Sequence, residues 1–128
     1  MIEIKKLAVA AALMAIVAAV SGTATTSAYA VEGKRIFNKC KACHSFDKNK
    51  VGPHLGGVVG RKAGSLSDFK YSKAMEEAGA GGLVWTEENL DKFLTKPRDF
   101  VKKTKMSFAG LKKESQRKAV IEYLKEHK

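Results

Sequence analysis

Five adjacent residues combine two thiols with an imidazole: Cys40, Lys41, Ala42, Cys43 and His44. Cysteines three residues apart lie on one face of a helical turn, so both sulfurs can reach the vinyl groups of one porphyrin. The histidine that follows can then approach the iron as an axial ligand. This spacing predicts one haem, bound covalently through Cys40 and Cys43 and ligated by His44.

Three other uses of two close cysteines fit the chain less well. A thioredoxin-like dithiol normally opens a helix within an alternating strand–helix pattern, and no strands are predicted here. A zinc site needs further ligands, which His54 and His127 do not convincingly supply. A structural disulfide between cysteines three apart in a helix is strained. Covalent haem attachment is therefore the preferred interpretation.

The second axial ligand has to come from another part of the chain. After the first 30 residues the only methionines are Met75 and Met106. Met106 lies in a segment without helical periodicity, flanked by lysines, and can fold over the opposite face of the ring. His54 is the rival ligand, but it follows Pro53 in the segment expected on the His44 side. We predict His44 and Met106 as the iron ligands, a pair that raises the reduction potential and fills the coordination sphere.

Residues 1–30 have the order of a secretory signal peptide. Lys5 and Lys6 precede the apolar run 7–20, and a tail of small residues ends in Ala28, Tyr29 and Ala30. The apolar run is shorter than the roughly 20 residues that span a membrane. We expect cleavage after Ala30, a mature domain over residues 31–128 and a periplasmic location. An uncleaved N-terminal anchor is the alternative.

The elements that position these residues are predicted to be helices joined by long loops. Apolar periodicity indicates helices over residues 31–44, 71–78 and 114–128, and a further helix that Thr86 caps and that stops before Pro97. The glycine-rich stretch 46–68 and residues 98–111 are predicted as loops. The chain is therefore all-α, and loops this long in a small domain need a surface to wrap around.

The charge is strongly positive, at +11 from 24 basic and 13 acidic residues. A positive ring around an electron exit would steer an acidic partner. Nucleic acid, the other usual partner of such charge, is not expected of an exported haem protein. Basic residues cluster in the segments expected near the haem edge: Lys39, Lys41, Lys50, Arg98, Lys102, Lys103, Lys105, Lys112 and Lys113.

In these motifs and their order, residues 31–128 resemble the class I c-type cytochromes, especially the bacterial cytochromes c2. The resemblance implies the small cytochrome c fold, with four to five helices around one haem. The N- and C-terminal helices would cross at Gly33, with Phe37 packed against Val120 and Tyr123.

The resemblance also implies roles for residues around the haem. The Pro53 carbonyl would accept a hydrogen bond from the His44 imidazole, and Phe108 would lie beside the exposed haem edge. Arg61, Tyr71 and Trp85 match positions around the haem propionates. The cofactor-binding residues implied are Cys40, Cys43, His44, Pro53, Arg61, Tyr71, Trp85, Thr104 and Met106.

The chain departs from the family pattern at four places. Phe93 stands where many relatives have a tyrosine that hydrogen-bonds the ligand sulfur. Met75 replaces an asparagine near a propionate, and Asp99 interrupts a basic stretch. Residues 79–82 are a small insertion before Trp85.

The function implied is a soluble, monomeric, periplasmic carrier that shuttles one electron between membrane redox complexes without catalysis. It would run from a bc1-type donor to an oxidase or a photosynthetic reaction centre, docking transiently on acidic surfaces, with no stable membrane insertion after cleavage. One alternative is a haem enzyme such as a peroxidase, which needs an open iron site and an acid–base group. The other is an anchored cytochrome within a respiratory assembly.

Overall fold

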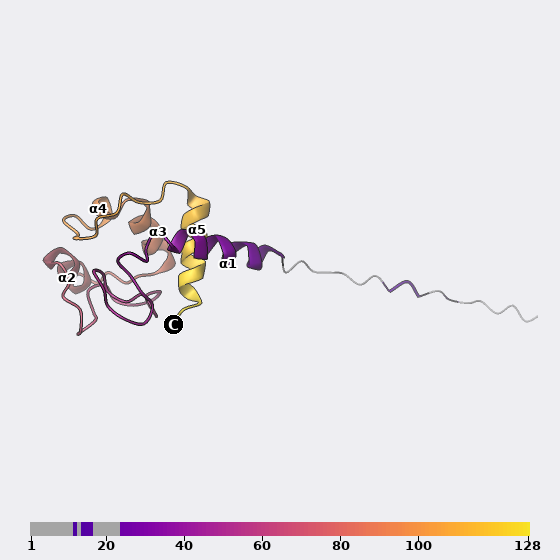
Figure 1. The fold of residues 1–128 in the computed structure, drawn as a ribbon, viewed down its shortest axis with the longest axis horizontal. Helices are drawn as coiled ribbons and strands as arrows, with labels where there is room; N and C mark the ends of the chain where they lie inside the picture. Colours follow the sequence, from indigo (N-terminus) through magenta and orange to yellow (C-terminus); the bar gives the residue numbers. More distant parts are fainter. Residues whose placement is uncertain (1–11, 13, 17–23) are drawn as a thin grey trace, which may run out of the picture.

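Helices from opposite ends of the chain cross at one side of the molecule (Figure 1). These are α1 (Ala24–Phe37) and α5 (Glu114–Lys125) in the computed structural model, which describes residues 12, 14–16 and 24–128. A Cβ atom on Gly33 would overlap the Ala119 carbonyl oxygen and lie 2.6 Å from the Tyr123 Cβ. The two backbones can approach this closely only because Gly33 has no side chain.

The crossing buries the apolar faces of both helices. Ile36 and Phe37 are buried on α1, and Val120, Ile121 and Leu124 on α5. The α5 residues are spaced one and four apart, so they form one helical stripe. This stripe continues toward the centre of the molecule, because Val120 and Leu124 also line its main cavity.

An aromatic cluster extends this core to the end of the chain. The Phe46 ring stacks on Phe37 with centroids 4.5 Å apart and on His127 at 3.8 Å. Tyr123 meets Phe37 at 5.5 Å. The carbonyl of His127 accepts a hydrogen bond from the Gly57 amide at 2.8 Å. The last residues of the chain therefore hold the glycine-rich loop against α5.

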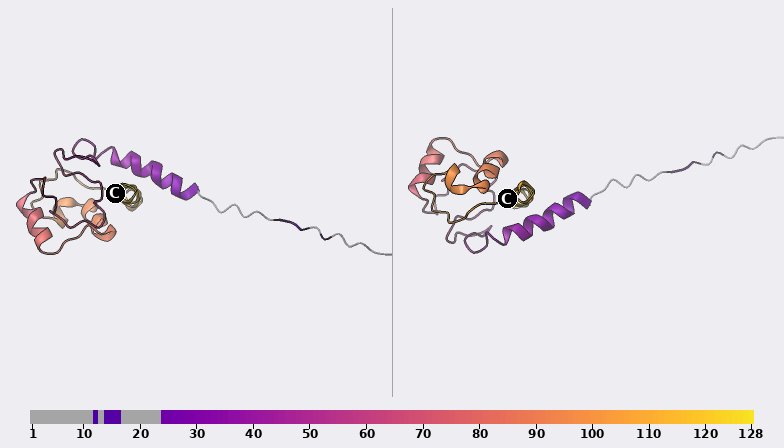
Figure 2. Two further views of the ribbon diagram at one scale, coloured as in Figure 1. Left: turned by 90° about the horizontal axis from the view of Figure 1, so that it is seen from below. Right: turned by 90° about the horizontal axis from the view of Figure 1, so that it is seen from above.

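Three further helices complete the fold: α2 (Lys73–Ala80), α3 (Glu87–Thr95), which packs against α5, and α4 (Pro97–Phe100). The Ser72 hydroxyl caps α2 and the Thr86 hydroxyl caps α3, each accepting an amide hydrogen bond at 3.1 Å. In Figure 2, α5 is seen nearly end-on, with α1 running past it and α2 at the far side of the molecule.

The fold is all-α, as predicted. The described part of the chain has five helices and no strand, with one isolated bridge between Lys62 and Val84. The helix capped by Thr86 forms as expected, and the helices expected over 71–78 and 114–128 occur at Lys73–Ala80 and Glu114–Lys125.

Three element boundaries were predicted wrongly. The first helix begins at Ala24 and not at residue 31. The first helix ends at Phe37 and not at His44, because the chain tightens into turns in which the amides of Lys39 and Cys40 bond three residues back. The predicted loop 98–111 overlaps α4, which begins at Pro97. Proline suits the first turn of a helix because its missing N–H would be unpaired there.

Most of the predicted leader, including most of the apolar run 7–20, lies outside the described residues. Its last seven residues form the start of α1, so the expected cleavage position after Ala30 falls within that helix. Among the residues that the structure describes, no helix is long and apolar enough to cross a membrane.

Candidate haem-binding site

A cavity of about 470 Å³ lies between the turn after α1, the glycine-rich loop, α3 and the segment from α4 to α5. The structure brings all nine predicted cofactor-binding residues to its walls: Cys40, Cys43, His44, Pro53, Arg61, Tyr71, Trp85, Thr104 and Met106. His54, the rival ligand, is not among the described residues that line the cavity. The residues predicted from short motifs far apart in the chain thus meet around one space.

The middle of the cavity is apolar. Leu90, Phe93 and Leu94 present the buried face of α3 to it, and Val58 and Trp85 close it from the loops. Trp85 packs on Phe93 with ring centroids 4.8 Å apart. Walls of this kind exclude water and match the faces of a porphyrin.

The two cysteines are free thiols at the wall of the cavity, Cys40 half-buried and Cys43 exposed. The amides of Cys43 and His44 both donate to the Cys40 carbonyl, at 3.1 and 2.8 Å, which winds the segment into one tight turn. Burial raises the pKa of the Cys40 thiol, and the neighbouring Cys43 raises it further. Among the described residues, no group of three or more His, Cys, Asp or Glu side chains could hold a metal ion, so the zinc alternative lacks its ligands.

His44 is fixed by the glycine-rich loop. Its Nδ1 donates to the Pro53 carbonyl at 2.8 Å. Burial lowers the pKa of His44, with Lys50 lowering it further and the bond to Pro53 opposing the shift. The ring is thus held neutral, and Nε2 is its acceptor nitrogen, the form that ligates a metal.

Gly52 has a role that the sequence analysis did not assign. A Cβ atom at Gly52 would lie 2.7 Å from Nδ1 and 2.8 Å from Nε2 of His44. The Gly52 amide also donates to the Cys43 carbonyl at 2.8 Å. Only glycine lets the loop pack this closely on the imidazole, and its place directly before Pro53 is the one sequence signal that could have indicated it.

Met106 is half-buried in the segment between α4 and α5. Its amide donates to the Thr104 hydroxyl at 3.3 Å. Met75, from α2, also lines the cavity, and the buried ring of Phe93 has no hydroxyl to offer a sulfur. The cavity lining therefore contains two thioethers, from Met75 and Met106.

Polar side chains gather at another part of the wall. Arg61 donates to the carbonyls of His54 at 2.8 Å and Gly56 at 2.5 Å. Burial lowers its pKa, but an arginine side chain remains protonated at neutral pH. The Tyr71 hydroxyl accepts from the Leu66 amide at 3.2 Å and keeps its own proton to donate. With the Trp85 indole these groups can bind carboxylates.

The Lys and Arg side chains that line the cavity have no acidic side chain beside them in its described wall. Its lining includes four cationic residues (Lys39, Arg61, Lys70 and Lys105), and no carboxylate occurs among the described residues of its wall. Asp99, which interrupts the basic stretch, pairs with Lys96 at 3.3 Å. Asp99 therefore also offsets the positive charge of Lys96.

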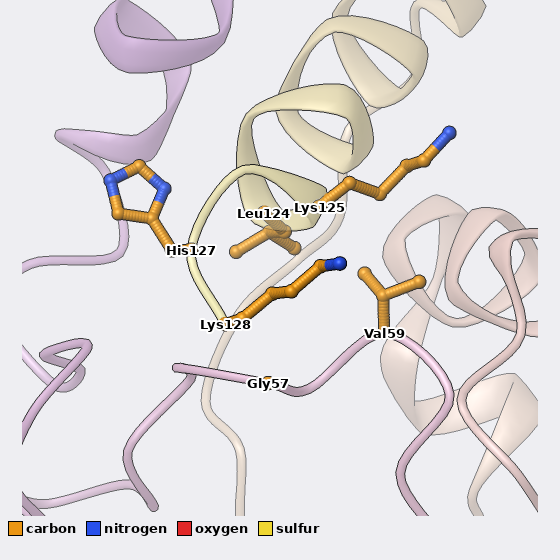
Figure 3. A pocket seen from close by; sticks show the side chains of 6 residues that line it. All are labelled: Gly57, Val59, Leu124, Lys125, His127 and Lys128. Atoms are coloured by element: carbon orange, nitrogen blue, oxygen red, sulfur yellow. The ribbon is translucent and has the colours of Figure 1, made fainter.

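A second hollow of about 370 Å³ lies at the end of α5, shown with its lining in Figure 3. Leu124, Lys125, His127 and Lys128 face it from the C-terminus, and Gly57 and Val59 from the glycine-rich loop. These six lining residues include no thiol or thioether, so the hollow does not compete as the haem site.

The residues of the main cavity fit a haem. Two thiols on one turn, a neutral imidazole oriented by a carbonyl, a thioether and apolar walls match what a covalently bound porphyrin requires. The donors of Arg61, Tyr71 and Trp85 match its carboxylates.

Comparison with known proteins also indicates a c-type cytochrome. The chain matches the family described as Cytochrome c over residues 30–128. It is 54% identical over 96 residues to cytochrome c2 of Afifella marina, covering 73% of this chain and 77% of that one. It is 40% identical over 135 residues to cytochrome c2 of Rhodopseudomonas palustris, covering 94% and 96%. Its fold matches ferricytochrome c2 from Rhodopseudomonas palustris with a TM-score of 0.73 and 43% identity, over 77% of this chain and 98% of that one.

Proposed function

Since the chain belongs to the cytochrome c family and carries one haem c on Cys40 and Cys43, we propose that it shuttles single electrons between membrane redox complexes. His44 and Met106 are the proposed iron ligands. The observation that carries this proposal is the cavity in which both thiols, the oriented imidazole and a methionine meet. A haem bound there supplies one-electron cycling between ferric and ferrous iron.

Other residues of the cavity wall have separate roles in this proposal. The Pro53 carbonyl holds the tautomer and direction of His44. The Met106 thioether would hold the iron together with His44, and a thioether ligand would favour the ferrous state and exclude other ligands. Arg61, Tyr71 and Trp85 bind the haem carboxylates, and Thr104 orients the backbone of Met106.

The partners proposed are acidic surfaces of membrane complexes: a bc1-type donor, and an oxidase or photosynthetic reaction centre as acceptor. The four cationic residues of the cavity lining, with no carboxylate among its described residues, support this proposal. Complementary charge speeds encounter and orients the carrier more than it prolongs binding, as a shuttle requires. The carrier itself is proposed to act as a soluble monomer that binds no nucleic acid.

We place the mature protein in the periplasm, after cleavage of residues 1–30. The contacts of α1 with α5 support this boundary, because Gly33, Ile36 and Phe37 all follow Ala30. The relative that covers 94% of this chain also aligns with part of the leader. Fractionation tests the boundary, since an intact leader acting as an anchor would keep the protein in the membrane pellet.

Electron carriage and a peroxidase-like activity differ in access to the iron. A closed His44–Met106 site resists added ligands, whereas an enzyme site binds peroxide or cyanide rapidly. Fast binding to the ferric protein at neutral pH would favour the enzyme.

The decisive experiment combines intact mass, an absorption spectrum and a redox titration of protein matured in an export- and haem-competent host. We expect the mass of residues 31–128 plus one haem, a spectrum of histidine–methionine ligation and a one-electron titration. A colourless but compact product, or iron without sulfur ligation, would overturn the proposal.

A further inference from the structure

The segment that carries Met106 is fastened at its ends and not along its length. Before Met106, the Thr104 amide bonds to the Val101 carbonyl at 3.1 Å. After it, the Leu111 amide bonds to the Leu94 carbonyl of α3 at 2.7 Å. Within the described chain, none of residues 105–110 makes a backbone–backbone hydrogen bond. The position of Met106 therefore depends on how firmly the two ends are held.

One side chain fastens the later end. Arg117 on α5 donates from Nη1 to the carbonyls of Leu111 and Lys112, both at 2.9 Å. Its Nε donates to the Asp91 carboxylate of α3 at 2.7 Å. The Arg117 side chain is only 11% exposed. A single guanidinium thus joins α3, α5 and the end of the Met106 segment, using the planar fork that arginine offers and lysine does not.

From these contacts we infer that Asp91 and Arg117 form a positioning pair, which keeps the Met106 segment closed and so sets how often Met106 leaves the iron. The inference rests on the proposed ligation by Met106. Asp91 matters because it supplies the counter-charge of a largely buried guanidinium. Without that carboxylate Arg117 turns toward water, and the Leu111 and Lys112 carbonyls lose their donor.

The chain contains a matched control. Lys125 on α5 pairs with Glu87 on α3 at 3.2 Å, so it joins the same two helices, but none of its hydrogen bonds reaches the Met106 segment. Glu87→Gln removes an α3–α5 ion pair without touching the segment, whereas Asp91→Asn removes the one that holds it. Comparing the two separates closure of the segment from general stability.

The experiment measures cyanide binding to the haem-loaded ferric proteins, because cyanide binds when Met106 is displaced. For Asp91→Asn we expect about tenfold tighter cyanide binding, the effect of losing one charge-assisted hydrogen bond. For Glu87→Gln we expect a change within about twofold, as for an exposed ion pair. Arg117→Lys should resemble Asp91→Asn, since lysine keeps the charge but not the fork. Equal cyanide binding by Asp91→Asn and Glu87→Gln would overturn the inference.

Hydrogen exchange distinguishes failure of this inference from failure of the proposed ligation. The Leu111 amide should exchange about tenfold faster in Asp91→Asn than in wild type and be unchanged in Glu87→Gln. If the wild-type spectrum lacks sulfur ligation, the proposed function fails, while exchange at Leu111 still reports whether the pair holds the segment. If ligation is present and Leu111 exchanges equally in both variants, only the positioning pair is wrong.

Discussion

Replacing Gly33 with alanine tests the helix crossing on which the whole site depends. The new Cβ would lie 2.6 Å from the Tyr123 Cβ and overlap the Ala119 carbonyl oxygen, whereas ordinary contacts begin at 3.4 Å. Neither obstructing atom can rotate away, because one is backbone and the other is bonded directly to it. The two helices must therefore separate by about 1 Å, which weakens the dispersion contacts along the crossing.

The expected loss of stability follows from two opposing effects. Overpacking a tight site costs about 1–3 kcal/mol, and rigid obstacles favour the upper end of this range. Alanine in place of a helical glycine recovers about 1 kcal/mol. We expect the free energy of unfolding of the haem-loaded protein to fall by about 2 kcal/mol for Gly33→Ala.

Urea unfolding, followed by haem absorbance and by helical circular dichroism, measures this change. Gly81→Ala is the matched control, because Gly81 has a φ of −76° and its added Cβ would meet nothing closer than 3.4 Å. We expect that variant to stay within about 0.5 kcal/mol of wild type. If Gly33→Ala proves as stable as wild type, the close crossing does not exist in solution and the reasoning fails.

Three further predictions concern the site. Met106→Ala should lower the midpoint potential by several tens of millivolts or more and let the ferric iron bind added imidazole; an unchanged potential in a redox titration would show that Met106 is not the ligand. The double variant Cys40→Ser, Cys43→Ser should be colourless and largely unfolded by circular dichroism, since apolar cavity walls collapse or become exposed without the haem; a compact, helical product would contradict this. Electron transfer to an acidic membrane complex should slow by roughly tenfold or more from low to high ionic strength, because the Lys and Arg side chains that line the cavity have no carboxylate beside them in its described wall; stopped-flow rates that do not vary with salt would remove the steering argument.

Helix positions could be predicted where one residue marks a boundary. The Thr86 hydroxyl was predicted to cap α3 and accepts the Asn89 amide at 3.1 Å. The end of α1 could not be predicted this way. Ile36, Phe37 and Cys40 have helical spacing, but the amide of Cys40 bonds to the Phe37 carbonyl three residues back, so the same spacing continues through a tighter turn. Periodicity alone does not separate these two cases.

The residues of the site, too, could be predicted from the sequence only in part. Spacing within the sequence identified Cys40, Cys43 and His44, because covalent chemistry fixes their separation. The positions of Arg61 and Trp85 came from family resemblance, since only the folded chain brings them to the cavity. Asp91 and Arg117 gave no signal at all: they are one acidic and one basic residue among many, and their pairing depends on how α3 and α5 pack.

The contact between α1 and α5 also determines when during synthesis the chain can complete its fold. α1 and α5 enclose between them every proposed haem-binding residue, so the native crossing cannot form until the final residues have left the ribosome. Contacts of such long sequence separation form slowly. If the chain is exported unfolded, as proposed above, Cys40 and Cys43 would therefore stay accessible for haem attachment until α5 packs against α1. The order of the helices in the chain would thus leave time for the thioether bonds to form before the fold closes.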